Sequence, residues 1–252
     1  MNIIRIKLPL KKYRFSPITV KEYTQLLLVR KEIDEYDDLA EEILDDLLEE
    51  MFPDIEPIYR SYVFLQVFAV SIGKTVIPIS YKCPKCNSIK RTAFQIGLPE
   101  LSIPELSTAG ITIKFRHALS ISTDVFEAFE QTVTSVSDGV NAYSWKQLTK
   151  ELKEQIMSVI SLEDFEKVLK QIFPVCINVK FKCCEETNLM YTRFKDIFKL
   201  ILSPEEIQSA YMINHMMTKH NYSIQDVNSM TPMERTITLA LIEKEIKESK
   251  QK

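Results

Sequence analysis

The sequence predicts an α+β fold that is mainly helical, with a β element split into two separated parts and a helical module at the C-terminal end. Three observations lead to this fold class. Apolar residues recur at helical spacing over residues 34–72. Apolar and polar residues alternate in short segments between residues 75 and 182, which is typical of strands. Helix-start signals then recur after residue 200. We therefore expect three regions, residues 1–74, 75–200 and 201–252.

The first region is expected to begin with an extended segment and to continue in helices. Residues 2–16 alternate apolar and basic side chains, which favours an extended conformation. Thr19 and Glu22 form a capping box, which predicts a helix running through residues 26–28. A second helix is predicted over residues 34–51, and Pro57 can serve as the first residue of a third. Residues 58–72 are apolar nearly all round, so we expect this third helix to be the centre of the core.

The second region is expected to hold the split β element. Strands are predicted over residues 75–82 and 91–96, on either side of a tight turn, and over residues 110–116. Helices are predicted over residues 123–137, over 145–160 behind a cap at Ser144, and over 162–172 behind a cap at Ser161. A strand over residues 177–182 follows, and residues 189–193 can return from it. The inserted helices thus separate the two halves of the β element.

The third region is predicted to be a helical protein-binding module. Residues 203–206, Ser-Pro-Glu-Glu, combine an N-cap, a proline at the first helical position and a glutamate that reaches back. Residues 231–234, Thr-Pro-Met-Glu, repeat this device. The helix that follows carries one apolar stripe, formed by Met233, Ile237, Ala240 and Leu241.

The composition argues against several classes of function. The formal net charge is −3 and basic residues are scattered among acidic ones, which argues against nucleic-acid binding. The chain has four glycines, no two of them within ten residues of each other, where average usage would give roughly 18. Glycine-rich phosphate loops and the Gly-x-Ser-x-Gly elbow are therefore absent. The sequence predicts a protein without enzymatic activity and without a small-molecule substrate.

The start of the chain and its hydropathy predict a cytoplasmic protein. No apolar run near Met1 is long enough for a signal peptide. The most apolar stretch, residues 62–72, is about half the length of a membrane-spanning helix. We therefore expect no membrane span.

The cysteines are the sharpest chemical signal. Residues 83–86, Cys-Pro-Lys-Cys, follow a predicted strand at the spacing of a zinc knuckle, in which two thiolates reach one metal ion. Cys183 and Cys184 follow another strand, but the position three after Cys183 is Glu186, so this second knuckle is irregular. We predict a structural, zinc-ribbon-like site formed by Cys83, Cys86, Cys183 and Cys184. The alternative is that these cysteines remain reduced thiols in a pair of hairpins. Cys176 is expected to be a small buried side chain.

Other candidate residues have structural interpretations beside the functional ones. The acidic face of residues 34–51 is either a solvated helix surface or a docking surface for a basic partner. Met212, Met216 and Met217 are either core residues or part of a groove for a partner's helix. The three histidines lack metal-ligand spacing and are expected to be surface or hydrogen-bonded core residues.

Several motifs together indicate a family. They are Phe15-Ser-Pro17-x-Thr19-Val20-Lys21-Glu22-Tyr23, Ser71-Ile72-Gly73-Lys74, the first cysteine knuckle with Phe94 after it, Phe173-Pro174, and Phe194 with Phe198. Over roughly residues 1–200 the chain resembles the baseplate hub assembly protein family of T-even-like contractile-tailed bacteriophages. Residues 223–235, which contain Met-Thr-Pro-Met-Glu-Arg, are similar to the helical tails of phage tail-assembly chaperones. The family's second knuckle is usually Cys-x-x-Cys, and this chain departs from it at Cys183-Cys184.

The resemblance implies a non-enzymatic role in building the baseplate hub. The leading hypothesis is a chaperone-like assembly factor that binds other phage baseplate hub or tail proteins in the host bacterial cytoplasm. It predicts apolar faces of the C-terminal helices that stay incompletely buried. A structural subunit retained in the virion is the second hypothesis, a zinc-ribbon nucleic-acid-binding protein the third, and an enzyme the fourth.

Overall fold

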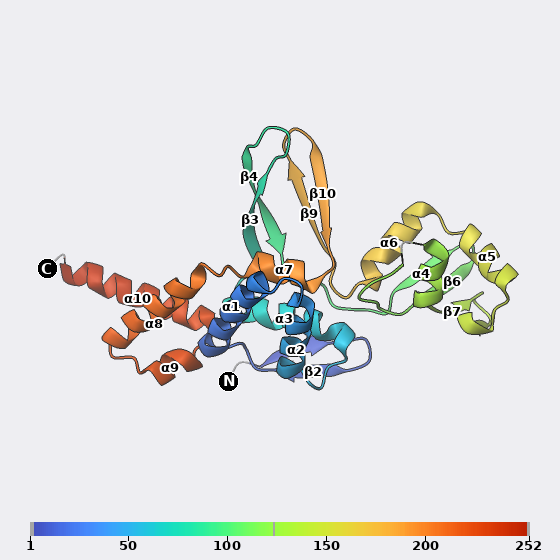
Figure 1. Ribbon diagram of the computed structural model, residues 1–252. Helices are drawn as coiled ribbons and strands as arrows, with labels where there is room; N and C mark the ends of the chain where they lie inside the picture. Colours follow the sequence, from blue (N-terminus) through green and yellow to red (C-terminus); the bar gives the residue numbers. More distant parts are fainter. Residues whose placement is uncertain (1–2, 123, 251–252) are drawn as a thin grey trace.

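The computed structural model describes residues 3–122 and 124–250 and shows a mixed α/β protein with helices at its C-terminal end. Residue 2 of the predicted extended segment and residue 123 of the predicted helix lie outside the described residues. Two β-hairpins stand side by side on a helical body, an inserted unit lies to one side, and the C-terminal helices lie to the other (Figure 1).

The helical body begins with a short hairpin and two helices that are divided differently from our prediction. β1 (Ile4–Lys7) pairs antiparallel with β2 (Lys12–Phe15), and the capping box at Thr19 begins α1 (Val20–Glu35). α2 spans Ala40–Met51. The predicted helix over residues 34–51 is therefore wrong at its start, because α1 continues through Asp34, which forms an ion pair with Arg30 one helical turn earlier.

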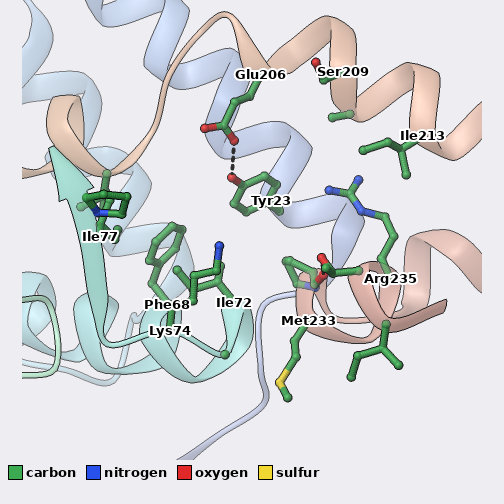
Figure 2. A pocket seen from close by; sticks show the side chains of 17 residues that line it. Tyr23, Phe68, Ile72, Lys74, Ile77, Glu206, Ser209, Ile213, Met233 and Arg235 are labelled. Atoms are coloured by element: carbon green, nitrogen blue, oxygen red, sulfur yellow. Dashed lines mark hydrogen bonds between the residues drawn. The ribbon is translucent and has the colours of Figure 1, made fainter. Parts of the chain in front are cut away.

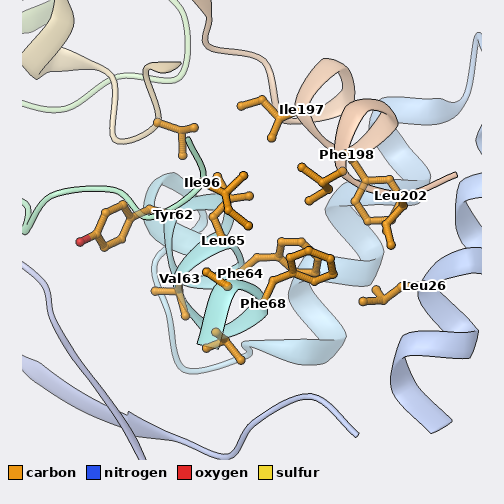
Figure 3. Close-up of a cluster of buried hydrophobic side chains, with 14 of the residues drawn as sticks. Leu26, Tyr62, Val63, Phe64, Leu65, Phe68, Ile96, Ile197, Phe198 and Leu202 are labelled. Carbon is orange, nitrogen blue, oxygen red and sulfur yellow. The ribbon is translucent and has the colours of Figure 1, made fainter. Parts of the chain in front are cut away.

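The third helix is the centre of the core, as predicted. α3 (Pro57–Ile72) starts with Pro57 at its first turn and ends at Gly73, which has a left-handed conformation. Phe64 and Phe68 are fully buried, and their rings stack at a centroid distance of 5.6 Å. α7 (Phe194–Ile201), a helix that we did not predict, packs Phe194 and Phe198 against Phe64. Figure 3 shows Phe198 of α7 above Phe64 and Phe68, with Leu26 of α1 nearby.

The split β element consists of two hairpins that are far apart in the sequence. β3 (Val76–Lys82) pairs with β4 (Ile89–Gln95), and β9 (Ile177–Lys182) pairs with β10 (Glu186–Tyr191). The hairpins are joined by side chains: the rings of Tyr81 and Phe181 stack at 4.2 Å, and the Thr92 hydroxyl donates a hydrogen bond to the Lys180 carbonyl at 3.3 Å. The return strand was predicted at residues 189–193, and the structure starts it earlier, at Glu186.

The chain between these hairpins folds around a hydrophobic core of its own. Its sheet has the order β5 (Glu105–Thr108), β6 (Ile111–Phe115), β7 (Val133–Ser137), β8 (Ala142–Ser144). The helices of this unit are α4 (Val125–Thr132), the 3₁₀ turn η1 (Trp145–Gln147), α5 (Lys150–Ser158) and α6 (Leu162–Ile172). The core contains Phe115, Phe129 and Trp145.

Two predictions within this inserted unit were wrong, and two of its strands were not predicted. Residues 133–137 belong to a strand, not to a helix, because Val133 and Val136 face the core of the insert when the segment pairs with β6. The predicted helix over residues 145–160 is divided, and its regular part is capped by Thr149 instead of Ser144. β5 and β8 were not predicted.

The C-terminal module is helical, as predicted, and packs on α1. It contains α8 (Glu206–Lys219), α9 (Ile224–Ser229) and α10 (Pro232–Lys250). The predicted N-cap at Ser203 lies two residues too early, because the N-cap of α8 is Glu205. The Ser203 hydroxyl still accepts the Glu205 N–H, at 3.3 Å, in the turn before the helix. The device at residues 231–234 is confirmed: the Thr231 N–H donates to Glu234 Oε2 at 2.8 Å, and the Glu234 N–H donates to Thr231 Oγ1 at 3.1 Å. Across the described ranges, no helix has the length and apolarity needed to cross a membrane.

Candidate functional site

The structure brings the four predicted cysteines together. Cys83 and Cys86 lie at the tip of the β3–β4 hairpin, and Cys183 and Cys184 lie at the tip of the β9–β10 hairpin. Their four Sγ atoms all lie within 4.8 Å of one another, and those of Cys86 and Cys183 are 3.5 Å apart. The cluster therefore joins two segments about a hundred residues apart in the chain, Cys83 to Cys183 being 183 − 83 = 100 positions.

Local turns explain how each pair of cysteines faces the other. The Cys83 N–H donates to the Ser88 carbonyl and the Asn87 N–H donates to the Cys83 carbonyl, both at 2.9 Å, which closes the first turn. Asn87 has a φ of 56°, a conformation that asparagine tolerates better than most residues. In the second hairpin, residues 183–185 form a bend, so the adjacent cysteines do not alternate across a strand. Glu186, which stands where a fourth knuckle cysteine was expected, belongs to β10 and pairs with Lys182.

The thiols influence one another's ionisation. Hydrogen bonds from Ser88, first from its hydroxyl and then from its backbone N–H, lower the pKa of Cys86 to about 6. Hydrogen bonding to Cys86, together with burial, raises the pKa of Cys184 to about 12. Closely spaced thiolates repel one another, so full ionisation of this cluster needs a cation among them.

The geometry fits a tetrahedral metal ion. Zinc–sulfur bonds of about 2.3 Å place the sulfur atoms of a tetrahedral site about 3.8 Å apart. The four Sγ atoms lie within 4.8 Å of one another, with one pair at 3.5 Å, which is close to the spacing of such a site. Among the described residues, the cluster contains four cysteines and no histidine, which is the donor set of a structural site. Cys176 lies elsewhere and is half-buried, less buried than expected.

The histidines do not join this site. His117 is buried, and its Nδ1 lies 3.2 Å from the Tyr59 hydroxyl of α3, which agrees with the predicted hydrogen-bonded core role. Burial lowers its pKa, so the ring stays neutral at physiological pH. His215 is exposed on α8 and His220 follows the end of that helix.

A groove lies where the C-terminal module meets the helical body, and it was not predicted. Its volume is about 470 Å³, and α1, α3, β3, α7, α8 and α10 all contribute to its lining. Figure 2 shows Lys74, Glu206 and Arg235 at this groove, with Phe68, Ile72 and Met233 around them. The Tyr23 hydroxyl donates a hydrogen bond of 2.8 Å to Glu206 Oε2, which links the body to the module. Burial, and then the charge of Glu206, raise the pKa of Tyr23.

Comparison with protein families identifies the chain. Residues 1–199 match the family described as T4 bacteriophage base plate protein. The chain belongs to this family. Residues 201–247 match the family described as Baseplate hub assembly protein Gp51 C-terminal domain, so both matches support the predicted baseplate hub assembly family. No curated protein and no solved structure matches the chain.

In this baseplate protein, the C-terminal module exposes many apolar side chains, as the leading hypothesis predicts. Met217 is fully buried, whereas Met212 of the same helix is 63% exposed, so the methionine set is divided between core and surface. Leu241 of α10 is 57% exposed. The other exposed large apolar residues of the module are Tyr211, Ile224, Met233 and Ile237.

The acidic face of α2 is exposed to solvent over its whole length. Glu41, Glu42, Asp45 and Asp46 make no ion pair with a described residue, whereas Glu49 pairs with Arg60 at 2.9 Å. Just before α2, Asp37 pairs with Lys195 and Lys199 of α7, and hydrogen bonds from Lys199 and then Lys195 lower the pKa of Asp37 to about 2. Asp37, which lies between α1 and α2, therefore links α7 to the helical body through two ion pairs.

Proposed function

We propose that this protein is a non-enzymatic, chaperone-like assembly factor that binds other hub proteins through its C-terminal helices. The observation that carries the proposal is the exposed apolar surface of α8 and α10, with the groove beside it. Exposed apolar patches of this kind are typical of protein-binding surfaces. Hub subunits that are not yet assembled expose the apolar surfaces through which they later bind one another. In this proposal, α8 and α10 cover such a surface until the next subunit binds.

The way the module is attached supports this role. The Val20 N–H at the start of α1 donates to the Met230 carbonyl just before α10, at 2.7 Å. Val20, Met217, Val227 and Ile242 form a small buried cluster between the body and the module. The inner faces of the module are thus occupied by the protein's own core, and the outer faces are free for a partner.

The role of the four cysteines within this proposal is to bind one structural zinc ion. The ion joins the two hairpin tips, which are otherwise connected by side-chain contacts such as the ion pair between Lys85 and Glu185. The three-part division at residues 1–74, 75–200 and 201–252 is also part of the proposal. Elemental analysis of the purified protein tests the metal: about one zinc per chain is expected, and Cys83→Ser should lose it. A wild-type protein purified without zinc at the cluster would contradict this part.

Surface substitutions test the assembly role. Leu241→Asp and Met212→Asp place a charge on the exposed apolar surface and should weaken co-purification with hub proteins of the same phage by at least tenfold. Leu119→Asp is the matched control, because Leu119 is 54% exposed but lies in the inserted unit. Hub binding that survives both substitutions at the module would refute the proposal.

A structural subunit of the baseplate hub is the second candidate function. The description of the matched family, T4 bacteriophage base plate protein, favours it. The two functions differ in where the protein is at the end of assembly: an assembly factor acts in the host cytoplasm and is absent from purified tails, whereas a subunit is present there at a fixed stoichiometry. Quantitative mass spectrometry of purified tails separates them.

A further inference from the structure

The groove between the body and the C-terminal module contains a nearly buried cation, Arg235, that forms no ion pair with a described carboxylate. Arg235 of α10 is 8% exposed, and its Nη1 donates a hydrogen bond of 3.1 Å to Asn214 Oδ1, a neutral acceptor. Within the described part of the chain, no carboxylate oxygen lies within 4.0 Å of its guanidinium group. The charge of Glu206, which lines the same groove, stabilises the guanidinium group only from beyond this distance. A buried charge is costly unless it is paired, so an anion that contacted the guanidinium group directly would stabilise it further.

A second cation lies at the same groove. Lys74, at the end of α3, lines it, is exposed, and pairs with no described carboxylate. The acidic side chain of the lining, Glu206, already accepts the hydrogen bond of the Tyr23 hydroxyl. Figure 2 shows Lys74 and Arg235 among the side chains that line the groove, with the hydrogen bond between Tyr23 and Glu206 as a dashed line. With Lys74 and Arg235 against the one carboxylate of Glu206, the lining carries one more positive than negative charge.

The rest of the lining is mainly apolar. Phe68 and Ile72 come from α3, Ile77 from β3, Ile213 from α8, and Met233 from α10. The volume of about 470 Å³ falls in the range of about 300–1,000 Å³ that is usual for binding pockets. A ligand for this groove thus needs a carboxylate at one point and apolar groups next to it. A small anion alone would leave the apolar walls uncovered.

We propose that this groove receives a segment of another hub protein in which a carboxylate is flanked by apolar side chains. The carboxylate, from a side chain or a chain terminus, pairs with Arg235 and Lys74, while its apolar neighbours cover Ile213 and Met233. The inference rests on the proposed function, because that function supplies the partner. Charge complementarity selects this occupant over a basic segment, which would meet two cations at the opening.

Binding kinetics with a purified hub protein that binds the wild-type chain provide the test. Arg235→Gln removes a buried charge partner and should raise the dissociation rate at least about 30-fold. Lys74→Glu alters the rim and should lower the association rate about tenfold and weaken its salt dependence. Lys219→Glu is the matched control, because Lys219 is exposed on α8 outside the groove, and its affinity should stay within about twofold. Arg235 is nearly buried, so loss of binding in Arg235→Gln can also result from misfolding. Lys74 is exposed, so a loss of binding in Lys74→Glu reports on the groove itself.

Cross-linking then identifies the occupant. A photo-reactive amino acid at Ile237, which lines the groove and is 50% exposed, should cross-link to a hub-protein peptide that contains a carboxylate among apolar residues. Replacing that carboxylate by its amide should weaken binding to the wild-type chain and should add little to the loss already caused by Arg235→Gln. The inference is overturned if both groove variants bind like the control, if the cross-linked peptide lacks a carboxylate, or if it comes from a second copy of this chain. Loss of binding in Leu241→Asp with unchanged binding in both groove variants would refute this inference alone and leave the proposed function standing.

Discussion

Replacing Gly73 by alanine should destabilise the junction between α3 and the C-terminal module. Gly73 ends α3 with a φ of 67°, and the Lys74 N–H behind it donates to the Ala69 carbonyl at 3.1 Å. An L-residue in this left-handed conformation costs about 1–2 kcal/mol. The added Cβ would also lie 2.6 Å from the Met233 Sδ atom and 3.0 Å from its Cγ atom. Two separate costs therefore arise at one position.

The steric cost is limited because Met233 is flexible and 45% exposed. Full burial of a methionine side chain contributes about 1.5–3 kcal/mol, so displacing a half-buried one costs about 1 kcal/mol. Gly73→Ala should thus lower the free energy of unfolding by about 2–3 kcal/mol. In a Met233→Ala background the steric part disappears, and the same substitution should cost only the backbone strain of about 1–2 kcal/mol.

Urea unfolding measures these values with two probes that report on different parts of the molecule. Trp145 is the single tryptophan and is buried in the inserted unit, so its fluorescence reports on that unit. Far-UV circular dichroism reports largely on the helices of the body and the module. Gly73→Ala should shift the dichroism transition. A shift of less than about 0.5 kcal/mol, or an equal cost with and without Met233, would refute the reasoning.

Three further predictions concern the cysteine cluster, the acidic stretch and the two cores. Removing zinc with a chelator should lower the melting temperature of the wild-type protein, and Cys86→Ser should abolish that response. The stabilising contribution of Asp37, whose pKa is lowered to about 2, should be complete above about pH 4 and be lost as the pH falls toward 2. NMR titration checks this, and Lys199→Ala should move the pKa of Asp37 upward. Phe129→Ala should destabilise the inserted unit by about 3–5 kcal/mol in the tryptophan signal, while Phe64→Ala should do the same to the dichroism transition. Equal shifts of both signals in both variants would show that the two cores unfold together.

Local signals predicted much of the helical structure. The predicted capping residues Thr19, Ser161 and Thr231 all begin helices, because each side chain accepts a backbone N–H within its own first turn. The helix over residues 58–72 was predicted to be the core helix because apolar residues occur on all its faces. In the structure its side chains are among the most buried of the described residues. Such signals depend on neighbours in the chain, which the sequence displays directly.

Errors arose where distant contacts outweighed local preference. Residues 133–137 continue a helical pattern in the sequence, but they pair with β6, and that pairing buries Val133 and Val136. Ser144 has the residue type of a cap, yet the regular helix begins after Thr149. Residues 133–137 pair with strand residues about twenty positions away, and Ser144 pairs with Ser135, so the local helical pattern could not reveal either pairing.

By itself, the sequence determined the residue types at the cysteine cluster, the helical nature of the C-terminal module and the family to which the chain belongs. The tertiary structure decided that Cys183 and Cys184 both face Cys83 and Cys86, because the bend at residues 183–185 removes the alternation of a strand. The tertiary structure also created the groove, because its lining residues are far apart in the sequence and meet only after α1, α3, β3, α7, α8 and α10 have packed together. Arg235 is an ordinary charged residue in the sequence. Its burial next to a neutral amide, which makes it a candidate for binding an anion, exists only once α8 and α10 have packed against each other.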